Sequence, residues 1–540
     1  MGASNSTESV SIEQREAESI AASSGALPSL HTTFSTLADP NSHAIPLQSL
    51  EKSFSLTCKD PISEGPSIPD AFPDLLDHFG SAMVDLFFMP EKEGVSWVEF
   101  VKGYNKCSAR MSSSMSLNNL LRVFSATAKK AGLPLNLEFE SDDADCKISG
   151  FLLPTDVFLF FWLCWTMLWD SHNLRSSKAK ANLCLPDINH LVKSVLTSSS
   201  EVSSSLNIWD CDLLGLEVQL PFGNFISWIL STLSSLPDCF SQFVHARILS
   251  SVTQEQDNSE SSQSSELGET STSNVCVSHL LARGIAWAIS LTMRNTISEE
   301  LSRICFLSNM EAEGADENLL YRSSLHGRGL NRLWSNVEGY QGPLIMLISS
   351  HLGGASEGND TEKKCIIGVL THQGFENKDT FYGSSGSIYA IQPVFHAYSS
   401  TGKEKNFVYS HLHATGYEPH PKPVGIGFGG TAGNERIFID EDFARITVRH
   451  HAVDKTYQHG SLFPEQGFLP FEAPISEVEV WGLGGGRIKE RQDKLKKREE
   501  LFTEQRRKID LKTFTNWEDS PEKMMMDMMS NPNAVRREER

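Results

Sequence analysis

Six residues in the last quarter of the chain, Gly425–Gly430, have the spacing that binds a dinucleotide in other proteins. They read Gly-Ile-Gly-Phe-Gly-Gly and fit the pattern G-x-G-x-x-G. That chemistry requires a helix directly after the glycines, because free backbone amides at its start bind the pyrophosphate. Here Thr431–Glu435 has the composition of a turn and Arg436–Ile439 that of a strand. We therefore interpret the glycines as part of a strand and hairpin, and expect no cofactor.

Seven histidines gather in the same part of the chain and could ligate a metal ion. His411 and His413 are two residues apart, which would place both side chains on one face of a strand. Zinc sites combine such histidines with further His, Cys or carboxylate ligands. Because no such partner stands at a clear spacing, we predict no metal site. The histidines are His396, His411, His413, His420, His450, His451 and His459.

A further candidate for chemistry is the acidic corner, defined here as Glu435, Asp440, Glu441 and Asp442. Paired carboxylates can act as general acid and base, but a short acidic run between apolar segments is typical of a solvated turn. The chain also lacks the P-loop, G-x-S-x-G and H-E-x-x-H motifs. We therefore predict no enzyme activity and no small-molecule substrate. The acidic corner is then a turn or a partner-binding surface, and an uncharacterised enzyme is the alternative.

The first residues of the chain fit the acceptor pattern for N-myristoylation. They read Met-Gly-Ala-Ser-Asn-Ser, so removal of Met1 exposes Gly2, and a hydroxyl stands at the sixth position. The alternative is an ordinary flexible start. A single myristoyl chain gives only marginal membrane binding, and the flanking sequence offers neither a polybasic patch nor a cysteine before Cys58. With lipidation at Gly2, we predict reversible recruitment to a membrane rather than permanent anchoring.

Length and composition restrict the class of protein. A chain of 540 residues is too long for one core, and its net charge of −21 argues against nucleic-acid binding over the whole surface. The ten cysteines, from Cys58 to Cys365, form no C-x-x-C pair, which fits reduced thiols in the cytosol. The apolar run Val157–Trp169 would rise only about 20 Å as a helix, too little to cross a bilayer. We predict a buried core helix there, with a membrane segment as the alternative.

Residues 12–250 show apolar residues mainly at helical spacing. Two stretches, Phe34–Ile45 and Phe87–Phe100, have the helix–loop–helix rhythm of EF-hands. In the first, His43 and Leu50 stand where calcium needs oxygen ligands, and the second loop is one residue short. A third acidic stretch, Asp142–Asp145, lacks the required glycine and glutamate. We predict a degenerate, EF-hand-like helical domain, or another helical domain, without calcium.

Beyond this region the composition changes three times. Residues 251–274 are polar, acidic and rich in serine, as in a disordered linker, and residues 275–318 return to helical spacing as connecting helices. From 319 to 486, short apolar runs alternate with glycine-rich turns, which is typical of an antiparallel sheet. Residues 487–540 read as a basic helix and tail.

The basic helix, Arg487–Lys508, carries ten basic and five acidic side chains, a local charge of +5. Its apolar stripe is sparse, so we do not expect a core helix. It could be a solvated extension, a partner-binding helix, or a nuclear-localisation patch around Lys494–Arg498. For a partner, the expected contacts are Arg491, Lys494 and Arg498, and Met524–Met529 is a second adhesive segment.

The sheet region resembles the TLDc family over about Leu319–Gly486. Glycine and aromatic signatures of the family recur in order, which makes the resemblance specific. The sequence departs from the family pattern after Phe443, where Arg445–Leu462 replaces the Gly-Ser, Cys and Phe-x-Asn positions. The matching pieces are Leu320–Gly327, Gly342–Ile348, Phe381–Ser384, Ile426–Gly430, Ile437–Phe443 and Val478–Trp481.

The whole layout resembles one TLDc subgroup, which has a myristoylated start and includes a lysosome-associated, growth-kinase-linked protein. The resemblance implies a multidomain fold: an all-α, EF-hand-like N-terminal region, an α+β TLDc domain in which helices flank an antiparallel β-sandwich, and a C-terminal helix. It implies no established active site, a role in oxidative-stress resistance, and binding to the vacuolar proton-pumping ATPase (V-ATPase).

The resulting hypothesis is a non-enzymatic adaptor that binds the V-ATPase or a related membrane complex. It would be cytoplasmic and peripheral on the vacuolar or lysosomal membrane, or on the plasma membrane, held there through its myristoyl group. The alternative is a stress-protective protein of the nucleus or nucleolus that acts through the basic helix.

Overall fold

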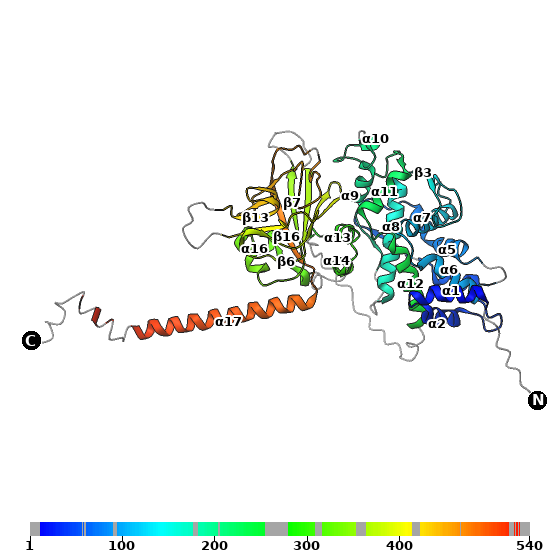
Figure 1. The fold of residues 1–540 in the computed structure, drawn as a ribbon, viewed down its shortest axis with the longest axis horizontal. Coiled ribbons are helices and arrows are strands. Elements are labelled where there is room, and N and C mark those ends of the chain that lie inside the picture. The colour runs from blue at the N-terminus through cyan, green and yellow to red at the C-terminus, as the bar shows by residue number, and fades with distance from the viewer. Residues whose placement is uncertain are drawn as a thin grey trace, which may run out of the picture.

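The structure is a computed structural model of the 540-residue chain. It describes residues 11–56, 58, 61–89, 94–175, 182–203, 206–253, 279–307, 316–352, 363–412, 422–464 and 466–517, with 523, 525, 526 and 529. The predicted lipidation at Gly2, residues 254–274 of the predicted linker, His413, His420 and half of Met524–Met529 lie outside these residues. Figure 1 shows a helical region beside a sheet region, from which one long helix projects.

The helical region contains the first twelve helices. Five short strands of two to five residues accompany them, too short for a periodic pattern in the sequence. β1 pairs with β4, and β3 lies between β2 and β5. The elements are α1 (Ile12–Ser23), α2 (Leu27–Leu37), α3 (Leu47–Ser53), β1 (Ile62–Ser63), α4 (Ala71–Asp77), α5 (Phe79–Phe87), α6 (Trp97–Ser108), α7 (Ser113–Lys130), β2 (Leu137–Phe139), β3 (Ile148–Leu152), α8 (Pro154–Arg175), β4 (Cys184–Leu185), α9 (Asn189–Thr197), α10 (Ser200–Ser203), β5 (Leu220–Pro221), α11 (Phe222–Thr232) and α12 (Asp238–Thr253).

Two helix–loop–helix units, α2–α3 and α5–α6, are joined through their loops. Ile45 and Val95 exchange backbone hydrogen bonds of 2.9 and 2.8 Å, which links the units as a pair. His43 has a φ of 51°, the left-handed conformation that a glycine supplies at the sixth position of an EF-hand loop. This register starts the loop at Ala38 and ends it at Ser49, one residue earlier than the sequence pattern indicated. Neither end residue carries the carboxylate that calcium needs there.

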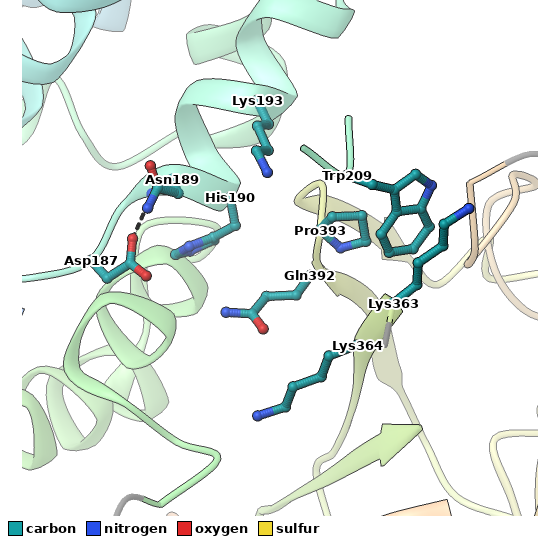
Figure 2. Close-up of a pocket in the computed structure, with 9 residues that line it drawn as sticks. All are labelled: Asp187, Asn189, His190, Lys193, Trp209, Lys363, Lys364, Gln392 and Pro393. Atoms are coloured by element: carbon teal, nitrogen blue, oxygen red, sulfur yellow. Dashed lines mark hydrogen bonds between the residues drawn. The ribbon is translucent and has the colours of Figure 1, made fainter. Parts of the chain in front are cut away.

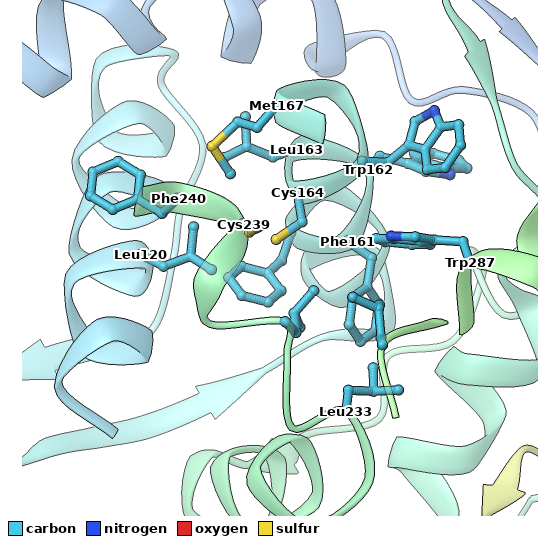
Figure 3. Packing of buried hydrophobic residues seen from close by; sticks show 14 of the residues in the cluster. Leu120, Phe161, Trp162, Leu163, Cys164, Met167, Leu233, Cys239, Phe240 and Trp287 are labelled. Atoms are coloured by element: carbon cyan, nitrogen blue, oxygen red, sulfur yellow. The ribbon is translucent and has the colours of Figure 1, made fainter. Parts of the chain in front are cut away.

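The apolar run within α8 is a core helix. Val157, Trp162, Trp165 and Met167 are all fully buried, and Figure 3 shows Trp162 and Phe161 among side chains from α12 and α13. Tertiary packing on every side explains why the run has no polar face. Among the helices that the structure describes, none is both long and apolar enough to cross a membrane.

The sheet region is one curled antiparallel sheet of eleven strands. Its order is β11-β10-β8-β7-β16-β15-β14-β13-β12-β9, and β6 also pairs with β16. The elements are α13 (Arg283–Ser290), α14 (Thr296–Leu307), η1 (Asp316–Asn318), β6 (Leu319–Arg322), α15 (Ser323–His326), α16 (Leu330–Val337), β7 (Leu344–Leu352), β8 (Lys363–Thr371), β9 (Lys378–Tyr382), β10 (Gly386–Gln392), β11 (His396–Ser399), β12 (Val408–His411), β13 (Gly425–Thr431), β14 (Asn434–Asp440), β15 (Arg445–Val448), β16 (Phe471–Gly482) and α17 (Gly486–Trp517).

The long strand β16 turns this sheet into a sandwich. Its first residues pair with β15, and its last residues pair with β7 and β6, so the two halves of the sheet fold over a common interior. Met346 and Ile348 of β7 point into that interior with Ile437 and Ile439 of β14. The predicted antiparallel sandwich flanked by helices is therefore confirmed, together with the helical N-terminal region and the C-terminal helix.

The outer face of β7 is also buried, because it packs on the helical region. Ile345 and Leu347 belong to the same core cluster as Trp287 of α13 and Phe161 of α8. Strands buried on both faces read as continuous apolar runs, which explains the unbroken sequence Leu344–Ile348. All eight residues of α13 are buried. Residues 275–318, where we expected connecting helices, contain α13 and α14, and α13 is central to the shared core.

Candidate protein-binding surface

The acidic corner lies at the end of β14, where the chain turns into β15. Asp440 holds the turn, because its Oδ1 accepts hydrogen bonds from the backbone N–H of Ala444 at 2.8 Å and of Arg445 at 3.3 Å. Phe443 has a φ of 56° and is buried, so its side chain anchors the turn beneath the acids. Asp442 is exposed, and Asp440 and Glu441 are half-buried.

Glu435 is separated from the other three acids and is not a surface residue. It stands at the opposite end of β14 and is only 2% exposed. Its Oε1 accepts from the backbone N–H of Gly433 at 2.6 Å, and Oε2 lies 3.7 Å from Arg449 Nη1. The grouping of Glu435 with a partner surface was therefore wrong: the carboxylate stabilises the hairpin between β13 and β14.

The first turns of α17 are fixed to the end of α16. The fully buried Gln492 donates from Nε2 to the carbonyl oxygens of Asn336 and Glu338, both at 3.0 Å. Lys496 Nζ donates to Asn336 O at 2.8 Å, and burial lowers the pKa of this lysine. These bonds satisfy carbonyls that the end of α16 leaves open. The sparse apolar stripe of this helix did not indicate such a polar anchor.

Beyond the anchor, α17 is exposed. Arg491, Lys494 and Arg498 are spaced i, i+3 and i+7 and so share one face of the helix, and all three are exposed. Lys494 lies 4.0 Å from Glu490, an exposed pair that contributes little to stability. Phe502 is 57% exposed. The 32 residues of α17 extend about 48 Å, and Figure 1 shows most of that length away from the body.

The acidic corner and the basic helix meet the two ends of α16. At its start, the N–H of Leu330 donates to Glu441 O at 2.8 Å; at its end, Asn336 accepts from α17. Because α16 has eight residues, its two ends, which contact the acidic corner and α17, are about 12 Å apart. The structure thus brings Asp440–Asp442 and the base of α17 together into one surface with an acidic and a basic end, which we call the α16 surface.

Replacing Gln492 with leucine is expected to loosen α17 at its base. The substitution keeps the side-chain size but leaves Glu338 O without its donor and Asn336 O with Lys496 alone, which costs about 1–3 kcal/mol locally. Hydrogen–deuterium exchange should become faster over the first turns of α17 and the end of α16. The exposed variant Arg491→Leu, one residue away, should leave exchange unchanged; equal protection in wild type and Gln492→Leu would contradict the anchor.

Among the residues that the structure describes, the glycine-rich segment forms a strand and the histidines belong to no metal-binding group. Gly425–Thr431 is strand β13, paired with β14 across a tight turn in which Gly433 has a φ of 83°, as the strand-and-hairpin interpretation predicted. In the residues that the structure describes, no group of three or more His, Cys, Asp or Glu side chains is placed to hold a metal ion. His450 instead stacks on Phe468, with ring centres 4.7 Å apart.

The segment that departs from the family pattern, Arg445–Leu462, is ordered by a buried ion pair that sequence reasoning missed. Arg436 Nη1 lies 2.9 Å from Asp454 Oδ2, and each side chain is 1% exposed. Arg436 also donates to Gly460 O at 2.9 Å and lies 4.8 Å from the Tyr398 ring centre. The sequence signal was an arginine inside an apolar strand, which requires a buried partner.

Comparison with known families agrees with this sheet. The TLDc domain family matches residues 293–484 of this chain, from just after α13 to just after β16. The chain carries a TLDc domain. The match begins before Leu319, so it adds α14 to the sheet that the sequence pattern delimited. It also spans the divergent segment Arg445–Leu462, which therefore belongs to the TLDc domain.

Two kinds of curated relatives are similar to this chain. MTOR-associated protein MEAK7 of Danio rerio is 26% identical over 200 residues, 36% of this chain and 40% of the relative. MEAK7 of Homo sapiens is 23% identical over 167 residues, and Oxidation resistance protein 1 of Rattus norvegicus is 24% identical over 166 residues, 16% of its length. The chain thus aligns with less than half of these relatives. The names of these relatives describe an association and a resistance rather than a reaction.

Proposed function

We propose that this chain is a reversibly membrane-recruited adaptor that binds the V-ATPase or a related membrane complex through the α16 surface and contributes to resistance against oxidative stress. The observation that carries the proposal is the anchored yet exposed α17. A helix fixed at its base by Gln492 and Lys496 presents its basic face in a defined direction, at little entropic cost to binding.

The charges favour a protein partner with an acidic face. Arg491, Lys494 and Arg498 are exposed, and the structure pairs only Lys494 with a carboxylate. The exposed Leu501 and Phe502 provide apolar contact farther along the helix. Basic residues around an apolar centre are a common composition for a helix that binds a partner. Asp442, at the other end of the α16 surface, would restrict the orientation of the partner.

The relatives' names agree with an adaptor. MEAK7 is named for its association with MTOR, and Oxidation resistance protein 1 for resistance to oxidation. We extend to the present chain a role in protein binding and in stress resistance. An enzyme is disfavoured because two of the four acidic residues, Glu435 and Asp440, hold turns of the sheet.

Replacing Gly2 with alanine is expected to shift the protein from the membrane fraction to the soluble fraction. Alanine at this position blocks myristoylation, and one acyl chain contributes most of a marginal membrane affinity. Cell fractionation combined with proximity labelling would measure the change, and Asn5→Ala is the matched control. A membrane fraction equal to wild type would contradict recruitment through Gly2. A nuclear pool that is insensitive to Gly2→Ala would favour the alternative, a nuclear protein acting through the basic helix.

A further inference from the structure

A cavity of about 270 Å³ lies between the helical region and the TLDc sheet. Asp187, His190 and Lys193 line it from the start of α9 and the preceding loop, and Lys363 and Gln392 line it from β8 and β10. Figure 2 shows these residues on elements from both regions, with the Lys363 side chain extending beside Trp209. Residues that belong to two regions of the fold therefore form one polar site.

The cavity is positively charged although the chain is acidic. Lys193, Lys363 and Lys364 line it together with Asp187, a net charge of +2 in a chain of −21. Lys193 Nζ donates to Ile208 O at 2.8 Å, which leaves two of its hydrogens available. In the part of the chain that the structure describes, no carboxylate forms an ion pair with any of the three lysines. Such a group of ammonium charges attracts a multivalent anion.

His190 supplies an independent indication of a ligand. Its side chain is 2% exposed, and Nε2 has no hydrogen-bond partner among the described residues. Burial lowers the pKa of this histidine to about 4, so the ring is neutral at physiological pH. An unsatisfied buried nitrogen costs about 1–3 kcal/mol. A bound molecule that forms a hydrogen bond with Nε2 would remove this cost.

The other lining groups define the ligand further. Asp187 accepts a hydrogen bond from the N–H of Asn189 at 2.9 Å. Its carboxylate would repel an anion but could accept a hydrogen bond from a hydroxyl group. Gln392 offers an amide that donates and accepts. Lys363 lies over the Trp209 ring, 5.5 Å from its centre, which holds this ammonium group at the rim. The lining therefore suits a molecule with both phosphate and hydroxyl groups.

We propose that this cavity binds a phosphorylated polyol, either as a free molecule or as the headgroup of a lipid. The phosphates would contact Lys193, Lys363 and Lys364, and ring hydroxyls would contact His190, Gln392 and Asp187. Because the site spans both regions, the ligand would hold them in a fixed relation. Phe395 N already donates to His190 O at 3.2 Å across this boundary, and Ser194 Oγ donates to Phe395 O.

The experiment is calorimetric titration of the full, non-acylated chain with inositol trisphosphate, beside inorganic phosphate and uncharged inositol. We expect the trisphosphate to bind and to raise the melting temperature, and uncharged inositol to give no heat. The variant Lys363→Gln/Lys364→Gln should weaken binding by roughly tenfold or more, because each lysine contributes a charge-assisted contact. The exposed pair Lys403→Gln/Lys405→Gln makes the same charge change elsewhere on the domain and should bind like wild type.

Flotation with phosphatidylcholine vesicles, with and without phosphatidylinositol bisphosphate, distinguishes the two sources of the ligand. Vesicle binding that soluble trisphosphate displaces supports a lipid headgroup; binding of the soluble molecule alone supports a free polyol phosphate. Two results would overturn the proposal: no binding of trisphosphate at millimolar concentration, or equal weakening in both double variants. Neither result bears on the α16 surface, because the titration contains no protein partner.

Discussion

Replacing Arg436 with methionine should lower the free energy of unfolding of the TLDc domain by about 3–5 kcal/mol. The arginine and Asp454 are each 1% exposed, and Asp454 also accepts hydrogen bonds from the N–H groups of Thr456 and Tyr457 at 2.8 and 3.0 Å. Methionine fills similar space but leaves a buried carboxylate without a counter-charge. Urea unfolding, followed by a signal from the sheet, would measure the loss.

Two further variants make this expectation specific. In Arg436→Met/Asp454→Asn both buried charges are removed while an amide oxygen can still accept from Thr456 and Tyr457, so part of the lost stability should return. Arg445→Met breaks the exposed pair with Glu472, whose side chains are 70% and 57% exposed, and should change stability by less than about 1 kcal/mol. If Arg436→Met were as stable as Arg445→Met, the ion pair would not be what orders Arg445–Leu462.

Replacing Trp162 with alanine should destabilise the helical region by about 3–5 kcal/mol, the usual cost of removing a large buried aromatic side chain. Trp162 is fully buried and donates from Nε1 to Pro186 O at 3.2 Å. Its ring centre lies 5.3 Å from that of Phe158 and 5.9 Å from that of Phe72. Thermal unfolding followed by circular dichroism would detect the loss.

The matched control for this substitution is Ile12→Ala, since Ile12 is 75% exposed at the start of α1. A surface change of this kind should stay within about 0.5 kcal/mol. The comparison also separates the two interpretations of Val157–Trp169. A core helix makes Trp162→Ala unfold at a lower temperature, whereas a membrane segment would leave stability in water nearly unchanged.

The sheet was predictable from the sequence because its strands are short apolar runs between glycine-rich turns. The apolar runs Pro343–Ser349 and Glu477–Trp481 correspond to β7 and β16 as expected. The strands β9 and β11 were missed, because they lie at the edges of the sheet and their exposed residues break the apolar pattern. Edge strands bury only part of one face, so they carry a weak signal.

The functional surface was harder to derive, because it depends on contacts between distant residues. Composition alone placed Glu435 with Asp440–Asp442, yet β14 puts it at the other end of the strand. Equally, α17 reads as a solvated helix because its anchor uses Gln492 and Lys496, polar residues whose partners are backbone carbonyls. The pattern of hydrophobic residues in the sequence does not reveal such contacts. The cavity around His190 likewise forms only where two regions of the chain meet.

We propose that the exposed basic face of α17, at one end of the α16 surface, binds an acidic partner at a membrane complex. The side chains of Arg491, Lys494 and Arg498 are exposed and take no part in the anchoring hydrogen bonds of Gln492 and Lys496, so changing them should not alter the fold. The anchor in turn makes the position of this face independent of the partner. Whether binding follows the charge of this face can therefore be measured without disturbing the TLDc domain.

The most direct measurement is a binding titration of purified V-ATPase with the full chain and with Arg491→Gln/Lys494→Gln/Arg498→Gln. We expect saturable binding by wild type, about tenfold weaker binding by the triple variant at low salt, and an unchanged melting temperature. A second triple variant, Lys403→Gln/Lys405→Gln/Lys455→Gln, carries the same charge change and should bind like wild type. No binding by wild type, or equal affinities for all three proteins, would contradict the claim.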